Sequence, residues 1–290
     1  MHMSDFESNY RIDNWNRSRG LFPPGDTTGV KNVLVNGLRA AYEVKGEGPD
    51  VLLIHGWMAS KRYWHEANQR IPEFRIWALD LYGFGDSEKP AEGYTLDGYS
   101  KFVKGFLDAV GVKRAAIVGH SMGGAVAAFT AISAPQRFWA LGLVDAALAG
   151  ITRTPPPWSA EPVMRMFMRL ADTSRSLGQM TITGMFGVGG PEGRIILEEA
   201  RKADVRAASL CGEMMSRPTD WSGLRGLKVP VIMVYGADDF LVDRGMDGEI
   251  GSLMPRIASS YIEDCGHLPM LEKPDEFYGI VDSFLEESRP

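Results

Sequence analysis

The chain has 290 residues, of which 44% are hydrophobic and 23% charged, and its formal net charge is −6 at pH 7. This composition excludes a disordered chain and leaves room for one large α/β domain with an inserted lid, or for two smaller domains. Because the acidic balance comes without a dense block of Lys or Arg, nucleic acid and anionic membranes are disfavoured as main partners, and a small uncharged substrate is expected.

Targeting and metal-binding patterns are absent from the sequence. The first 20 residues lack the apolar core of a secretory signal, and no apolar run approaches the roughly 20 residues that span a bilayer. Cys211 and Cys265 are the only cysteines, and we expect both to stay reduced in a cytoplasmic protein. The histidines form no HxH or HExxH pattern and the cysteines no CxxC pattern, so neither a metal nor a cofactor is expected.

The first predicted elements are two strands that follow an irregular leader over residues 1–30. Predicted strands at residues 33–35 and 38–44 flank Asn36-Gly37, a dipeptide that strongly favours a two-residue hairpin turn. We therefore expect a β-hairpin at the start of the folded domain.

Strands and helices then alternate up to residue 146. Further strands are predicted at residues 51–54, 75–79, 115–118 and 141–144, and helices at 96–110 and 122–133. The runs at 51–54 and 115–118 are wholly apolar, which is typical of strands covered on both faces. Repeated β–loop–α units predict an α/β fold with a doubly wound, mostly parallel sheet, in which ligands bind beyond the carboxyl ends of the strands.

This alternation breaks between residues 147 and 227. Three consecutive prolines at 155–157 exclude a regular element there, and a methionine-rich stretch with helical periodicity follows. Strand patterns return at 231–235 and 259–262, and a final helix begins at Pro274. We therefore predict three parts: a leader over residues 1–30, an α/β core formed by 31–146 and 228–290, and a helical cap over 147–227.

The sharpest motif is Gly119-His120-Ser121-Met122-Gly123, between a predicted buried strand and a predicted helix. Such a turn holds its serine in a strained conformation, and the small residues two before and two after it relieve the crowding. The hydroxyl then projects at a helix N-terminus, where backbone N–H groups favour developing negative charge. The motif predicts Ser121 as a nucleophile. The alternative is a helix-capping serine in a glycine-rich turn.

A serine nucleophile needs a base, and the base needs a carboxylate to orient it. His267 is the predicted base, because it lies in a loop after the last predicted strand and follows Ser121 in the chain. Its alternative role is that of a structural loop histidine. Three carboxylates at predicted strand ends could orient it: Asp145, Asp238 and Asp239. Spacing alone leaves all three open, and each could also be a loop carboxylate or a helix cap.

Taken together, these motifs resemble the α/β-hydrolase fold superfamily, in particular a serine esterase-like member with a helical cap. The matching pieces are His55-Gly56-Trp57, residues 80–87, Gly119 to Gly124, residues 236–242, and Gly266-His267 followed by Glu272-Lys273-Pro274. In the family pattern Gly-x-x-Asp-x-x-Val the acid stands three residues after the glycine, which implies Asp239. The resemblance also implies an oxyanion hole formed by the backbone N–H groups of Trp57 and Met122, with His55 bracing the loop.

Some residues of this sequence differ from those of related enzymes, and these differences reduce the number of reactions that the resemblance allows. Haloalkane dehalogenases and epoxide hydrolases resemble the fold but need an aspartate at the position of Ser121, so the serine speaks against both activities. Many C–C bond hydrolases have an asparagine where His120 stands, and the histidine weakens that option.

The predicted substrate pocket is apolar, with the candidate residues Met58, Phe167, Met185, Leu241 and Leu268. We therefore expect hydrolysis of small to medium, uncharged alkyl or aryl carboxylic esters through an acyl-enzyme on Ser121. The alternatives are C–C bond hydrolysis or acyl transfer on the same triad, and ligand binding by a homologue without catalysis.

Overall fold

The computed structural model describes residues 29–149, 165–166, 190–242, 247–254 and 257–290. Contacts within the chain divide it into two units, Met1–Val30 and Lys31–Pro290. The first unit, which covers the predicted leader, lies almost wholly outside the described residues. The fold is that of the second unit.

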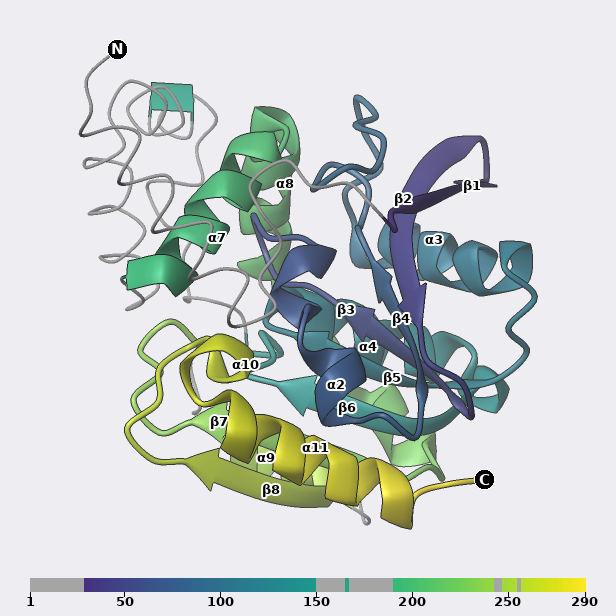
Figure 1. Cartoon of the computed structure of the whole chain (residues 1–290), viewed down its shortest axis with the longest axis vertical. Helices are drawn as coiled ribbons and strands as arrows, with labels where there is room; N and C mark the ends of the chain where they lie inside the picture. The colour runs from purple at the N-terminus through teal and green to yellow at the C-terminus, as the bar shows by residue number, and fades with distance from the viewer. Residues whose placement is uncertain (1–28, 150–164, 167–189, 243–246, 255–256) are drawn as a thin grey trace. The chain divides into compact units, whose positions relative to one another are not determined.

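The described residues form one eight-stranded sheet (Figure 1). Its strands are β1 (Lys31–Val35), β2 (Leu38–Lys45), β3 (Asp50–Ile54), β4 (Arg75–Leu79), β5 (Ala115–His120), β6 (Phe138–Val144), β7 (Val231–Gly236) and β8 (Ile257–Ile262). Their order is β1-β2-β4-β3-β5-β6-β7-β8, with β2 antiparallel to both neighbours and the remaining pairs parallel. The predicted doubly wound, mostly parallel sheet is confirmed.

The first two strands form the predicted hairpin. Val35 pairs with Leu38 across the turn, and the φ angles of Asn36 and Gly37 are 52° and 85°. A type I′ turn requires positive φ at both central residues, and Asn-Gly adopts them with little strain. The turn residues therefore set the register of the hairpin at this edge of the sheet.

Helices cover both faces of the sheet (Figure 1). On one face α3 (Leu96–Ala109) packs against α4 (Met122–Ser133), and α4 contacts β5 and β6. On the other face α11 (Pro274–Glu287) packs against α2 (Ala67–Arg70) and β8. Every residue of β5 and β6 is buried as a result. This explains why those strands are continuous apolar runs, as strands covered on both faces must be.

Some elements differ from the sequence predictions. The short helices η1 (Lys61–Trp64) and α2 were not predicted, because four residues carry too little periodicity to detect. Strand β6 begins at Phe138, three residues before the predicted start, since its first residues are also buried and follow directly on the turn η2 (Pro135–Arg137). The remaining short helices are α9 (Asp247–Leu253) and α10 (Pro269–Glu272).

The described residues between β6 and β7 form helices and no strand. They are α7 (Gly190–Lys202), α8 (Val205–Met215) and the short η4 (Ser222–Gly226), with α7 and α8 drawn in green in Figure 1. These helices agree with the predicted helical insertion between two strands of one sheet. The limits of the predicted cap stay a prediction, because residues 150–164 and 167–189 lie outside the described part. Of the helices that are described, none combines the length and apolar character needed to cross a bilayer.

Candidate active site

Ser121 lies on the turn from β5 into α4, with a φ angle of 53° and an exposure of 5%. A positive φ costs a non-glycine residue about 1–3 kcal/mol, so the surroundings must hold it in place. The flanking glycines make the turn possible: a Cβ on Gly119 would meet the Gly123 carbonyl oxygen at 2.2 Å. A Cβ on Gly123 would in turn meet the His55 carbonyl oxygen at 2.4 Å. The structure thus has the strand–turn–helix geometry that exposes a serine hydroxyl at the end of a sheet.

His267 and Asp239 are paired beyond the carboxyl ends of β7 and β8. His267 Nδ1 lies 2.8 Å from Asp239 Oδ2, and the two side chains are 4% and 1% exposed. The other oxygen of the carboxylate accepts the Leu241 N–H at 2.8 Å. Burial by itself raises the pKa of Asp239, but the hydrogen bond and charge of His267 and the Leu241 N–H outweigh it, so the pKa lies below its usual range. An ionised Asp239 keeps the imidazole proton on Nδ1, which leaves Nε2 as the acceptor nitrogen.

The structure distinguishes the three carboxylates that could, from their spacing in the sequence, orient His267. Asp238 is exposed and uses its backbone N–H for the Cys265 carbonyl oxygen. Asp145 is fully buried at the end of β6, where its oxygens accept the Gly236 N–H at 3.1 and 3.3 Å. Its carboxyl group is also hydrogen-bonded to Asp239, and burial, followed by the charge of Asp239, raises the pKa of Asp145 well above its usual value. Asp145 therefore keeps its proton to higher pH than an ordinary carboxyl group and is hydrogen-bonded to Asp239, a contact that spacing did not reveal.

The raised pKa of Asp145 predicts a pH-dependent contribution to stability. The unfolded carboxyl has a pKa of about 3.9, so the folded state binds the proton more tightly over a window that begins near pH 4. The stabilisation is complete below that window and is lost as the pH rises through the folded pKa, by up to about 1.4 kcal/mol per pH unit. Asp145→Asn keeps an acceptor for Gly236 and a donor to Asp239 but cannot ionise.

We therefore expect the unfolding free energy of Asp145→Asn to rise relative to that of the wild type between pH 5 and pH 8. Urea denaturation of both proteins at both pH values measures this difference, and the other titrating groups cancel in the comparison. A constant difference would show that Asp145 ionises with an ordinary pKa.

The two predicted oxyanion donors lie on either side of the nucleophile turn. Met122 is the first residue of α4, so its N–H is one of those that have no partner within the helix. Trp57 follows Gly56 in the loop after β3, and a Cβ on Gly56 would come within 3.2 Å of the Cβ of Ser121. The Trp57 indole Nε1 donates to the carbonyl oxygen of Ala208 in α8 at 2.9 Å. The backbone of the Gly56-Trp57 loop thus lies beside the Ser121 turn. The Trp57 side chain connects this loop to α8 through its hydrogen bond.

The predicted pocket residues are described only in part. Met58 and Leu268 are 1% and 2% exposed, and Leu241 is half-buried. Each of the three is next in sequence or hydrogen-bonded to a predicted site residue. Phe167 and Met185 lie outside the described residues, so the cap side of the pocket stays a prediction.

Within the described part of the chain, one group of side chains lies close enough together to bind a metal ion. It comprises His120, Asp145 and His267, whose ligand atoms all lie within 4.8 Å of one another. His120 uses both ring nitrogens in hydrogen bonds, to Tyr63 and to the His267 carbonyl oxygen. Both oxygens of Asp145 accept the Gly236 N–H. These atoms already have hydrogen-bond partners, so we assign the group to a polar network.

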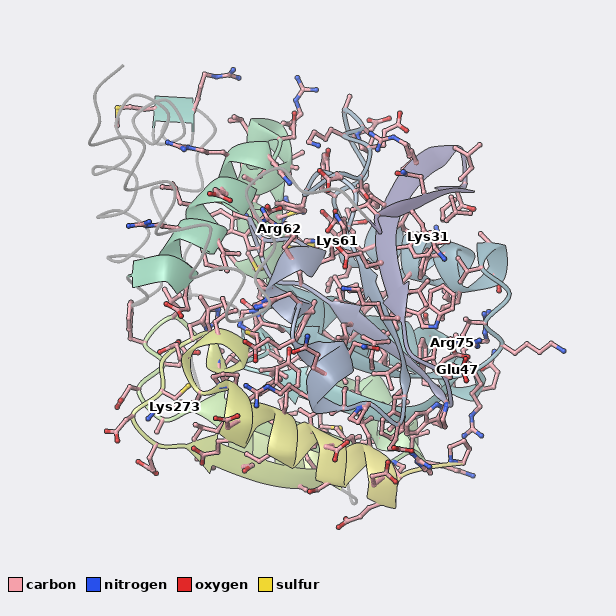
Figure 2. All side chains as sticks on the ribbon, viewed as in Figure 1. Lys31, Glu47, Lys61, Arg62, Arg75 and Lys273 are labelled. Atoms are coloured by element: carbon pink, nitrogen blue, oxygen red, sulfur yellow. The ribbon has the colours of Figure 1, made fainter. Side chains whose placement is uncertain are left out.

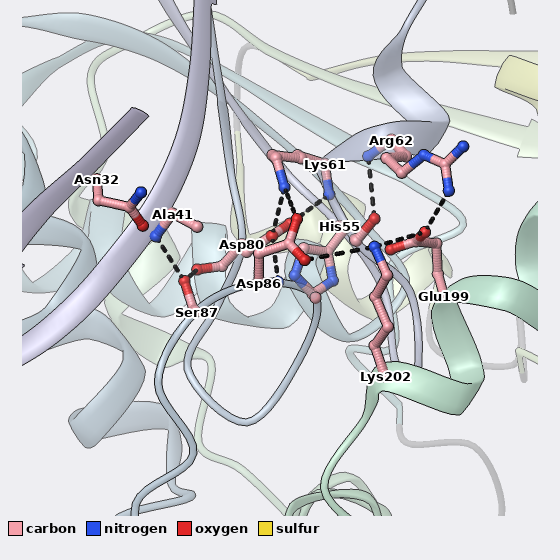
Figure 3. A network of polar contacts seen from close by, with 12 residues as sticks. Asn32, Ala41, His55, Lys61, Arg62, Asp80, Asp86, Ser87, Glu199 and Lys202 are labelled. Atoms are coloured by element: carbon pink, nitrogen blue, oxygen red, sulfur yellow. Dashed lines mark hydrogen bonds and ion pairs between the residues drawn. The ribbon is translucent and has the colours of Figure 1, made fainter. Parts of the chain in front are cut away.

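A buried ionic cluster lies beside the predicted oxyanion loop, residues 55–57 (Figure 3). Lys61 has a side chain that is only 1% exposed, and its ammonium lies 2.8 Å from Asp80 and 2.7 Å from Asp86. Burial by itself lowers the pKa of Lys61, but the charges and hydrogen bonds of the two aspartates outweigh it and raise the pKa. This cluster could not be predicted from the sequence, because lysine is almost always a surface residue.

The same cluster extends to helix α7. Arg62 pairs with Glu199 at 2.7 Å, and Lys202 lies 3.2 Å from Glu199 and 3.4 Å from Asp86. Figure 2 shows Lys61 and Arg62 next to each other between α7 and the strands. The cluster therefore joins η1, which follows the oxyanion loop, to α7 of the helical insertion.

Lys61→Met is expected to lower the free energy of unfolding by about 3–5 kcal/mol, because it leaves Asp80 and Asp86 without their buried cation. Lys101→Met is the matched control: Lys101 pairs with Asp97 at 2.7 Å, but the side chains are 66% and 61% exposed. Its loss should cost at most about 1 kcal/mol. Urea denaturation measures both changes, and equal small losses would contradict a structural role for the cluster.

Comparison with known proteins identifies the family and the fold. A model of the alpha/beta hydrolase family matches residues 51–280. An uncharacterized protein of Mycobacterium tuberculosis (strain ATCC 25618 / H37Rv) is 28% identical, over 94% of this chain and 86% of its own. A pimeloyl-acyl-carrier-protein methyl ester esterase of Aliivibrio fischeri (strain ATCC 700601 / ES114) is 28% identical, over 85% of this chain and 97% of its own. The crystal structure of a membrane phospholipase A, described as a bacterial virulence factor, superposes with a TM-score of 0.75 and 26% identity, over 99% of this chain and 93% of its own.

Proposed function

Because the chain belongs to the alpha/beta hydrolase family, we propose that it is a serine hydrolase that cleaves small to medium, uncharged carboxylic esters through an acyl-enzyme on Ser121. The observation that carries the proposal is the buried pair of His267 and Asp239, with Nδ1 and Oδ2 2.8 Å apart. His120, which directly precedes Ser121, is 2.7 Å from the His267 carbonyl oxygen through its Nε2, so the pair lies beside the strained serine turn.

The reaction runs in two halves. In the first, Ser121 Oγ bonds to the ester carbonyl carbon, His267 Nε2 takes the hydroxyl proton, and the N–H groups of Trp57 and Met122 hold the oxyanion. Each of these donors contributes about 3 kcal/mol in the transition state. The proton then passes from His267 to the leaving alcohol as the ester bond breaks. In the second half, water replaces the alcohol, and the acid is released with Ser121 restored.

Two relatives support an ester as substrate. The methyl ester esterase and the membrane phospholipase A are named for enzymes that cleave carboxylic esters, and both match most of the chain. The buried Met58 and Leu268 favour an apolar acyl or alcohol group. We propose that residues 147–227 form a helical cap over this pocket. The buried free thiols of Cys211 and Cys265 fit a cytoplasmic site of action.

The test is hydrolysis of p-nitrophenyl esters from acetate to palmitate, with Ser121→Ala as the control. Turnover that peaks at short or medium chains and disappears in the variant supports the proposal. Turnover that rises to palmitate would instead favour a long-chain ester as substrate. An inactive wild type on every chain length would contradict the esterase and turn attention to C–C hydrolysis, acyl transfer or ligand binding.

A further inference from the structure

A chain of buried hydrogen bonds connects the three loops that carry the predicted site. The Gly56 N–H donates to the Tyr63 hydroxyl, and that hydroxyl lies 2.9 Å from His120 Nδ1. On the other side of the ring, His120 Nε2 lies 2.7 Å from the backbone carbonyl oxygen of His267. Tyr63 and His120 are each 2% exposed and His267 is 3% exposed, so water does not compete for these bonds.

The chemistry of the end groups fixes the direction of every bond in this chain. The His267 carbonyl oxygen can only accept, so His120 Nε2 carries the proton and donates it. In a neutral imidazole Nδ1 is then the acceptor, and the Tyr63 hydroxyl donates to it. The hydroxyl oxygen in turn accepts the Gly56 N–H. Each donor therefore has one acceptor, which no other placement of the protons achieves.

The buried surroundings keep both side chains neutral. Burial, followed by the charge of His267, holds the pKa of His120 well below its usual value. Burial also raises the pKa of Tyr63 well above its usual value. Neither group changes charge near neutral pH. The donor and acceptor of each hydrogen bond in this series therefore stay the same while His267, the proposed base, gains and loses a proton.

The hydrogen-bond chain begins at the Gly56 N–H, one peptide group before the Trp57 N–H that is the predicted oxyanion donor. The Gly56 carbonyl oxygen accepts His55 Nδ1–H at 2.8 Å, and His55 Nε2 accepts the Leu81 N–H at 3.0 Å. Gly56 is thus held through its N–H by Tyr63 and through its C=O by His55. Since that carbonyl shares a planar peptide group with the Trp57 N–H, the two bonds fix the direction of this N–H.

We propose that His120 is a positioning residue that, together with Tyr63, holds the oxyanion loop, the serine turn and the His267 loop at a fixed spacing. This role rests on the proposed function and deepens it. His120 touches no reacting atom: it is adjacent to Ser121 in the chain and bonds the backbone of the base rather than its ring. A shift of about 1 Å in such an alignment lowers a rate about a hundredfold.

Tyr63→Phe tests the chain with little change in packing. It keeps the ring, whose centroid lies 5.5 Å from that of His120, and removes only the hydroxyl that joins His120 to Gly56. We expect kcat to fall about ten- to a hundredfold while KM stays within about threefold, because the oxyanion contact forms only in the transition state. A Tyr63→Phe enzyme with the kcat of the wild type would overturn the proposal.

Substitutions at His120 separate positioning from packing. His120→Gln keeps an amide that can donate to the His267 carbonyl oxygen, so it should retain more of kcat than His120→Leu, which has a similar volume and no donor. In the His120→Leu background, Tyr63→Phe should lower kcat by a smaller factor than in the wild type, since only the Tyr63–Gly56 bond is left to lose. If the fold-losses in kcat of the two single variants multiply in the double variant, the two residues act as independent packing contacts. That result would refute the hydrogen-bond chain.

A spectrum of the unliganded wild type tests the same chain without any substrate. Long-range ¹H–¹⁵N correlation of the imidazoles at pH 7 should show His120 neutral with its proton on Nε2, and His120→Gln identifies the signal by its loss. A proton on Nδ1, or a charged ring, would overturn the proposal. If the wild type hydrolyses no ester, the proposed function fails, and the spectrum still decides whether the chain exists.

Discussion

Ser121→Ala is expected to lower kcat for p-nitrophenyl ester hydrolysis by about 10⁵- to 10⁶-fold, because it removes the only atom that can form the acyl-enzyme. The oxyanion donors and the binding site remain, so a small rate above that in water is expected to persist. The turn itself should survive, since alanine has the same backbone constraints as serine at a φ of 53°. Circular dichroism and urea denaturation verify that the variant is folded.

Covalent labelling tests the same residue without a choice of ester. An alkyl fluorophosphonate should react once with the wild type: Ser121 Oγ bonds to phosphorus, fluoride leaves, and His267 takes the hydroxyl proton. Intact-protein mass should then rise by one phosphonyl group. Ser283→Ala, an exposed position on α11, is the matched control and should label like the wild type. Labelling of Ser121→Ala to the same extent would exclude Ser121 as the nucleophile.

Labelling also separates the competing functions. A wild type that takes the label at Ser121 yet hydrolyses no ester has a working nucleophile and base. Its reaction would then be C–C hydrolysis or acyl transfer, which product analysis with added acceptor alcohols distinguishes. A wild type that takes no label favours ligand binding without catalysis.

Asp239→Asn is expected to lower kcat by about 10⁴-fold with little change in stability or KM. An asparagine amide at this position can donate to His267 Nδ1, which places the imidazole proton on Nε2. A protonated Nε2 cannot accept the proton of Ser121. The kcat values of the variant and the wild type on the best p-nitrophenyl ester measure the effect, with active-site titration to correct for unfolded protein.

Asp238→Asn is the matched control for this substitution. It makes the same chemical change one residue away, on an exposed side chain, and should leave kcat within about twofold of the wild type. Asp145→Asn should fall between the two, because it retains a donor to Asp239 in a fully buried site. If Asp145→Asn were as inactive as Asp239→Asn, Asp145 would have a larger part in the reaction than the geometry supports.

Local structure could be predicted well from the sequence. Strand β4 and helix α4 have the predicted ends, and the hairpin turn lies at the predicted Asn36-Gly37. These features depend on neighbours within a few positions: an all-apolar run, a glycine two residues away, or a turn that needs positive φ. The glycine pattern around Ser121 is of this kind, because the atoms that exclude a Cβ at Gly119 belong to Gly123, four positions away.

The arrangement of the site residues was harder to predict from the sequence. Spacing left three carboxylates open, and the resemblance to the family, rather than the residues themselves, pointed to Asp239. The fold decides between them, because it buries Asp239 against His267, leaves Asp238 in solvent and hydrogen-bonds Asp145 to Asp239. These differences come from strands that are far apart in the sequence and adjacent in the sheet.

The α/β class, the strained serine turn and the set of groups that could act with it can thus be inferred from the sequence, since each depends on short-range sterics and periodicity. The charge and orientation of those groups depend instead on the three-dimensional fold. Lys61 is buried because Asp80 and Asp86 surround it, and His120 is oriented by Tyr63 and by a carbonyl oxygen 147 positions away. Burial and hydrogen-bond direction are properties of neighbours in space, and no local pattern in a chain encodes them.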